Sequence, residues 1–252
     1  LAAATGGLVG LSTTAFLKAL GWTTATTRAF LPHHYLLLPV CLAASVVIVR
    51  RLAPEAAGHG TEKVIAAIHK SSGKIKWPVI PIKLLATIIT IAGGGSVGKE
   101  GPCAQIGGGL SSLFADIFKL DDHDRKKIVI CGISAGFASV FGTPIAGAIF
   151  GVEVLFVGNI LYEVLLPSFI AGVTAYQIST SLGITYFYHP LNFVPKFSEA
   201  FFVKIAIAGI FFGLCSWLLI ESLCYGKKQA ERLRIWRPLK GLVGGAALAI
   251  LT

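Results

Sequence analysis

The sequence predicts an all-α, multi-pass integral membrane protein built of tilted and broken helices. Composition is the first observation that predicts this class. The chain of 252 residues is 54% hydrophobic and 13% charged, whereas a soluble domain carries about 25% charged residues. The second observation is that apolar segments recur along the whole chain, without the alternating polarity of a transmembrane β-strand.

Several apolar segments are shorter than the ~20 residues that cross a bilayer as a straight helix. Many are also interrupted by glycine or proline, which is typical of helices that end inside the membrane around a protein-lined cavity. The segments are Ala2–Ala19, Tyr35–Val49, Trp77–Ala92, Pro102–Phe118, Ile128–Val140, Thr143–Val157, Leu161–Leu182, Phe201–Leu223 and Gly241–Leu251.

The positive charge lies between the apolar segments. The formal net charge is +10, and its clusters are Arg50–Arg51, Lys63–Lys76, Lys119–Lys127 and Lys227–Lys240. This placement is expected of cytoplasmic loops under the positive-inside rule. Nucleic-acid grooves instead interleave aromatic and basic residues on a soluble face. We therefore expect membrane lipid and no nucleic acid as partners.

The sequence offers no pattern for metal or cofactor binding. None of the five cysteines forms a CxxC pair or a zinc-type Cys/His spacing, so we expect small buried side chains, no metal and no cofactor. An enzyme would have to use Glu100, His59 and His69 as acid/base groups, but the sequence shows no pattern that pairs a nucleophile with a base. We expect no enzyme; a purely structural membrane subunit stays open as an alternative.

The stretch GGGSVGKEGP, residues 93–102, resembles a phosphate-binding P-loop in all but its last position. A P-loop requires Ser or Thr after the lysine to bind Mg²⁺, and here Glu100 follows Lys99. The preceding apolar run, Val79–Ala92, is also too long for the strand that precedes a P-loop. The stretch is therefore not predicted to bind a nucleotide.

A helix that begins at Gly101 or Pro102 would point its free N–H groups and positive dipole end at the residues before it. Such an end attracts an anion. Glu100 could occupy this position as a tethered anion, and leave it when protonated or displaced by a mobile anion. Ionisable residues inside the membrane are usually functional, which favours the role of Glu100 as a movable anion at this site. The alternative is a carboxylate that only caps the helix.

A second candidate helix start lies upstream, where Gly58-His59-Gly60 precede Thr61-Glu62 and apolar residues at helical spacing. We expect the backbone around His59 to offer N–H groups to an anion. Its side chain either makes transport pH-dependent or bonds a loop carbonyl, and we favour the loop role.

These motifs resemble those of the CLC family of chloride channels and chloride/proton antiporters, of the prokaryotic type. Gly98–Pro102 match the family's GKEGP signature, extended by residues 105–108, QIGG. Gly58–Glu62 align with its GSGIP signature and depart from it at the second, fourth and fifth positions. Lys83 resembles the family's intramembrane lysine, and residues 136–156 resemble its following pair of helices.

The resemblance implies roles for the matching residues. Glu100 corresponds to the external gating glutamate, and His59 takes the place of the serine that contacts the central anion. The backbone of the anion path is then formed by Gly58, Gly60, Gly98, Lys99, Gly101 and Pro102.

The resemblance also bears on proton coupling. Glu153 matches the first of two glutamates that proton-coupled members carry, and Val154 takes the place of the second. This favours a passive, glutamate-gated chloride channel; the alternative is a proton-coupled antiporter of chloride or another anion such as fluoride.

The family fold pairs two inverted halves around a site at the membrane midplane. The resemblance implies a first transmembrane half at residues 1–200 and the truncated start of the second at 201–252. It also implies homodimerisation through Thr143–Thr180, location in a bacterial inner (plasma) membrane, and chloride as the transported ligand. Because the chain has no methionine, we expect either a fragment or a sequence that has lost its methionines. Because the resemblance implies one half of the fold plus a margin, we expect that the chain alone does not conduct.

Overall fold

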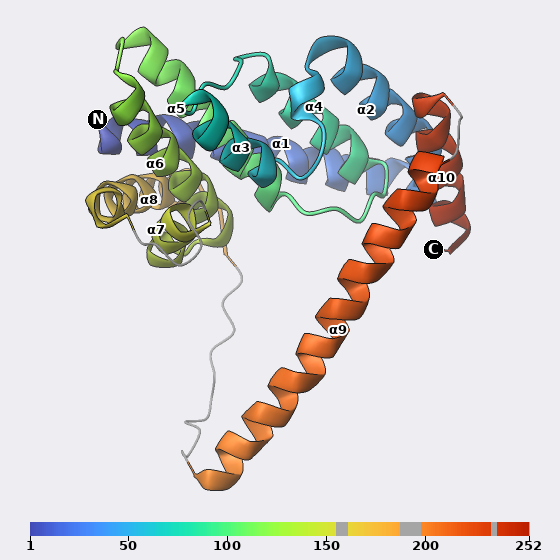
Figure 1. Cartoon of the computed structure of the whole chain (residues 1–252). Helices are drawn as coiled ribbons and strands as arrows, with labels where there is room; N and C mark the ends of the chain where they lie inside the picture. Colours follow the sequence, from blue (N-terminus) through green and yellow to red (C-terminus); the bar gives the residue numbers. More distant parts are fainter. Residues whose placement is uncertain (155–160, 187–197, 233–235, 252) are drawn as a thin grey trace. The chain divides into compact units, whose positions relative to one another are not determined.

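The computed structural model describes residues 1–154, 161–186, 198–232 and 236–251, and their regular structure is entirely helical (Figure 1). The expected all-α class is confirmed. The helices are α1 (Ala2–Phe30), η1 (His34–Leu37), α2 (Leu38–Leu52), η2 (Pro54–Ala56), α3 (Thr61–Ser71), α4 (Val79–Ala92), α5 (Glu100–Ile117), α6 (Asp122–Phe141), α7 (Pro144–Glu153), α8 (Tyr162–Ser181), α9 (Glu199–Arg232) and α10 (Arg237–Leu251).

Helix length and composition agree with a fold of broken helices. Among the described residues, His34–Leu52 and Glu199–Arg232 are long and apolar enough to cross a bilayer, with 19 and 34 residues. Shorter apolar helices lie at Val79–Ala92, Pro144–Glu153 and Pro238–Ile250. Residues 155–157, the end of the expected Thr143–Val157 segment, lie outside the described residues.

The chain divides into two compact units. The first comprises residues 1–186 and 241–252, and the second comprises residues 187–240, whose main described element is α9. Every candidate site residue named above lies in the first unit. The expected boundary between transmembrane halves at residue 200 stays a prediction.

The core of the first unit depends on backbones that approach closely at glycine. A Cβ on Gly107 of α5 would collide with the carbonyl of Gly132 on α6, and one on Gly136 would lie 2.6 Å from the carbonyl oxygen of Cys103. Gly10 of α1 similarly contacts the backbone of Ala175 on α8. Small residues at helix interfaces allow such approach in membranes, where dispersion contacts replace the hydrophobic effect. The two contacts between α5 and α6 hold α5 in place, and the contact at Gly10 joins α1 to α8.

Helix α1 continues beyond the apolar segment expected to end at Ala19. Its polar last third is rich in threonine, whose hydroxyls donate to carbonyls one turn earlier. Thr24 Oγ1 bonds the Leu20 carbonyl at 2.7 Å and Thr27 Oγ1 bonds the Thr23 carbonyl at 2.8 Å. Because these hydroxyls are satisfied within the helix, the polar residues do not end it, and α1 reaches Phe30.

A glycine turn separates α4 from α5. The Gly95 N–H bonds the Thr90 carbonyl at 2.9 Å and the Gly94 N–H bonds the Ile91 carbonyl at 3.0 Å. Gly94 has a φ of 95°, so the turn has the Schellman pattern that ends a helix at a left-handed glycine. The chain then reverses over a few residues and enters α5.

Candidate anion site

The two predicted anion-path segments meet in the structure. A Cβ on Gly60 would lie 2.5 Å from the carbonyl oxygen of Gly101, and a Cβ on Gly101 would collide with the carbonyl of His59. Gly60 also has a φ of 88°, which side-chain-bearing residues rarely adopt. Glycine is therefore required on both sides of this contact, where α3 and α5 begin.

Each of these helices presents unpaired amide groups at its start. The Gly60 carbonyl accepts from the N–H groups of Lys63 and Val64, at 3.0 and 3.1 Å. The amides before Lys63 have no carbonyl in their own helix to bond. Two helix N-termini, each equivalent to about half a positive charge, thus lie side by side.

Helix α5 begins at Glu100, one residue before the earliest expected start. The Cys103 N–H bonds the Lys99 carbonyl at 3.1 Å and closes the first turn. Pro102 has no N–H to bond and tolerates a place in this turn. Glu100 is consequently the first residue of the helix, not a loop residue in front of it.

The Glu100 side chain folds back over Gly98. A Cβ built on Gly98 would collide with Glu100 Oε2. Glu100 is half-buried and Gly98 is exposed. The carboxylate therefore lies at the N-terminal end of α5, where the helix dipole favours a negative charge.

Two buried polar side chains hold the loop that leads into α3. Lys83 of α4, 6% exposed, donates from Nζ to the carbonyls of Ala56 and Gly58, at 3.0 and 2.6 Å. Gln105 of α5, 1% exposed, donates from Nε2 to the Glu55 carbonyl at 3.1 Å. The N–H groups of Ala56 and Ala57 bond the carbonyls of Ala53 and Pro54, at 2.9 and 3.3 Å, so the loop is held from both its carbonyl and its amide sides.

The structure places the remaining predicted residues as follows. The His59 side chain is exposed, Lys99 is half-buried and Pro102 is buried. Glu153 is exposed at the end of α7, on an element separate from the α3–α5 contact, and Val154 packs against the main hydrophobic core. Described residues contain no group of three or more metal-ligating side chains.

Sequence reasoning did not single out Gln105 as a residue of the site. The sequence showed it as the first residue of the QIGG extension of the GKEGP signature, an amide within an otherwise small and apolar stretch. A buried amide must bond a partner, but the sequence alone did not show that the partner was the loop before α3.

Comparison with known proteins now identifies the class. The model of the voltage-gated chloride channel family matches residues 40–252. The chain therefore belongs to this family, the CLC family of integral membrane anion channels and transporters, and the resemblance drawn from the motifs is confirmed.

Individual relatives and solved structures agree with this family assignment. The chain is 33% identical over 243 residues to a chloride/fluoride channel protein of Pseudomonas syringae pv. tomato, covering 96% of this chain and 53% of that protein. The crystal structure of a CLC-type fluoride/proton antiporter matches with a TM-score of 0.91 and 27% identity, covering 99% of this chain and 63% of that one. The chain thus spans about half the length of the curated relative.

A slow cyanobacterial Cl⁻/H⁺ antiporter matches with a TM-score of 0.85 and 23% identity, over 99% of this chain and 62% of that one. At this identity the likeness establishes the fold alone. The expected CLC-type fold of broken helices is confirmed.

Proposed function

We propose that this protein carries a small halide across the membrane along a path gated by Glu100. The observation that carries the proposal is the contact between the N-terminal ends of α3 and α5 at Gly60 and Gly101. Because each end offers free amides and a partial positive charge, an anion is stabilised there without a full cationic partner. The carboxylate of Glu100 occupies this region when no mobile anion displaces it.

Fluoride or chloride is the proposed cargo. His59 is exposed at the start of α3 and brings no hydroxyl to the position where the family pattern places a serine on the anion. Backbone N–H groups then dominate recognition, and they favour a small anion that accepts strong hydrogen bonds. The chloride/fluoride channel protein of Pseudomonas syringae pv. tomato supports this choice.

The test uses the complete gene product in liposomes. Halide-selective electrodes would record chloride and fluoride efflux with the voltage clamped by an ionophore. We expect halide efflux above that of protein-free liposomes, and faster efflux with Glu100→Ala. Absence of efflux for both halides, or an unchanged rate with Glu100→Ala, would reject the proposal.

We further propose that transport is passive, because Val154 stands where the family pattern places the second, proton-carrying glutamate. The opposing candidate is proton-coupled exchange, which is favoured by the similarity to a fluoride/proton antiporter. Recording external pH during halide efflux separates them. Halide efflux without proton movement supports the channel, whereas proton uptake that Glu100→Ala abolishes supports the antiporter.

For assembly and location we propose a homodimer in the inner membrane of a bacterium. The exposed apolar groove between α7 and α8, lined by Ile145, Ile149 and Leu166 among others, supports the expected interface. Cross-linking of the complete protein in native membranes tests this. Recovery of monomer alone would contradict it.

A further inference from the structure

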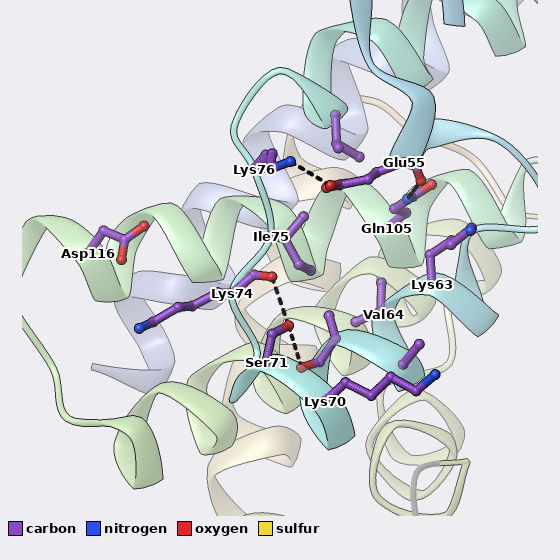
Figure 2. Close-up of a pocket in the computed structure, with 13 residues that line it drawn as sticks. Glu55, Lys63, Val64, Lys70, Ser71, Lys74, Ile75, Lys76, Gln105 and Asp116 are labelled. Atoms are coloured by element: carbon purple, nitrogen blue, oxygen red, sulfur yellow. Dashed lines mark hydrogen bonds and ion pairs between the residues drawn. The ribbon is translucent and has the colours of Figure 1, made fainter. Parts of the chain in front are cut away.

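A cavity of about 540 Å³ lies between α3, the loop that follows it and α5 (Figure 2). One wall is the face of α3 that carries Lys63, Ala66, Ala67 and Lys70. The two lysines are seven residues apart, about 10 Å along the helix, and Figure 2 shows them extending to the same side. The short alanine side chains between them leave the space open.

The charge in this cavity is unbalanced. Both carboxylates that line it are already paired: Glu55 Oε1 lies 2.7 Å from Lys76 Nζ, and Asp116 Oδ1 lies 2.6 Å from the buried Arg125. Lys63 and Lys70 have no ion pair among the described residues. Two free ammonium groups thus face one space.

An unsatisfied buried acceptor lies in the same cavity. Gln105 is 1% exposed, and its Oε1 has no hydrogen-bond partner although its Nε2 bonds the Glu55 carbonyl. A buried carbonyl oxygen without a partner is destabilising, because it has lost its bonds to water without gaining another donor. A donor on a ligand would remove this cost.

The remaining walls and their surroundings indicate a lipid. The half-buried Ala66, Ala67 and Ile75 give the cavity apolar surface, which a small inorganic anion cannot use. Trp77, directly before α4, is 64% exposed, and tryptophan is enriched at the membrane–water interface. Lys63 and Lys70 also belong to the Lys63–Lys76 cluster. The positive-inside rule places such a cluster on the cytoplasmic side, where it meets anionic lipids.

We propose that this cavity binds the headgroup of an anionic phospholipid. The phosphate lies between Lys63 and Lys70, and a headgroup hydroxyl donates to Oε1 of Gln105. The start of the acyl chains packs on the apolar walls. This lipid would contact α3, the helix whose first turn forms part of the anion site, but its binding does not depend on the transport function.

Native mass spectrometry of the detergent-solubilised complete gene product tests the site. The probes are phosphatidylglycerol, phosphatidylmethanol and phosphatidylcholine with the same acyl chains, and inorganic phosphate. We expect phosphatidylglycerol to bind more tightly than phosphatidylcholine. It should also bind several-fold more tightly than phosphatidylmethanol, which carries the same charge but no headgroup hydroxyl.

Paired variants isolate the two lysines. The double change Lys63→Gln and Lys70→Gln should weaken phosphatidylglycerol binding about thirty-fold, and Lys63→Arg with Lys70→Arg should retain it. The matched control, Lys119→Gln with Lys126→Gln, removes the same charge from basic segments outside the cavity and should leave binding within about two-fold.

Three results would overturn the proposal. Equal weakening by the control pair would mean non-specific attraction to a basic surface. Equal binding of phosphatidylglycerol and phosphatidylcholine would mean that the lysines do not select charge. Displacement of phosphatidylglycerol by an equal concentration of inorganic phosphate would assign the site to free phosphate.

Discussion

Lys83→Met is the substitution that most sharply tests how the anion site is held. The ammonium of Lys83 is buried and donates to the carbonyls of Ala56 and Gly58. Methionine is unbranched and only one heavy atom shorter than lysine, and it removes both the charge and the donors. The loop before α3 would then lose its two bonds to α4.

The expected loss in anion affinity follows from Coulomb's law. For an assumed separation of about 7 Å between the ammonium and the anion, and an effective dielectric constant of about 20, a unit charge contributes about 2 kcal/mol, which is about thirty-fold in affinity. The effect on folding is smaller. The buried Ala56 carbonyl loses its partner, at about 1–3 kcal/mol, but the cost of burying an ammonium is removed at the same time.

Isothermal titration of the complete gene product with fluoride and chloride measures the affinity, and thermal unfolding checks the fold. Lys76→Met is the matched control, because Lys76 pairs with Glu55 at the same loop, at 2.7 Å, but is exposed. An exposed pair contributes about 0–1 kcal/mol, so the control should bind halide nearly as the wild type does. Wild-type affinity in Lys83→Met would refute the reasoning.

Three further substitutions test separate parts of the account. Glu100→Gln removes the negative charge of the gate and should raise halide efflux from liposomes; wild-type efflux would contradict the gate. Gly98→Ala should raise efflux in the same direction, because the new Cβ would expel the Glu100 carboxylate, and wild-type efflux would count against that position. Gly107→Ala should lower the free energy of unfolding by about 1–3 kcal/mol, because the new Cβ meets the Gly132 carbonyl. The control Gly21→Ala meets nothing within 4 Å and should raise the free energy of unfolding by up to about 1 kcal/mol. Equal shifts in the two variants would contradict the packing of α5 on α6.

Local chemistry allowed much of the fold and site to be predicted. The break between α4 and α5 was predictable because glycines that end a helix and a proline that tolerates a first turn leave a recognisable pattern. Glu100 stands where a P-loop requires Ser or Thr to bind Mg²⁺, and this single position excluded a nucleotide site. The family then followed from the two signatures.

Other features depend on contacts between distant segments. The approach of Gly60 to Gly101 joins residues 41 positions apart, and neither glycine shows from its sequence neighbours which backbone it will meet. The first apolar segment was expected to end at Ala19, but the helix continues past Thr24 and Thr27, whose hydroxyls bond within it. The hydrogen bonds that Lys83 and Gln105 donate likewise depend on where the loop before α3 lies.

The most direct test of the central claim is to locate the anion against the backbone. Solid-state NMR of the ¹⁵N-labelled complete protein in lipid, at saturating fluoride, measures dipolar dephasing between ¹⁹F⁻ and individual amides. We predict dephasing at amides of residues 59–62 at the start of α3 and 98–101 at the start of α5, and stronger dephasing with Glu100→Gln. Fluoride flux with no dephasing at either helix start would contradict an anion site formed by these two N-termini.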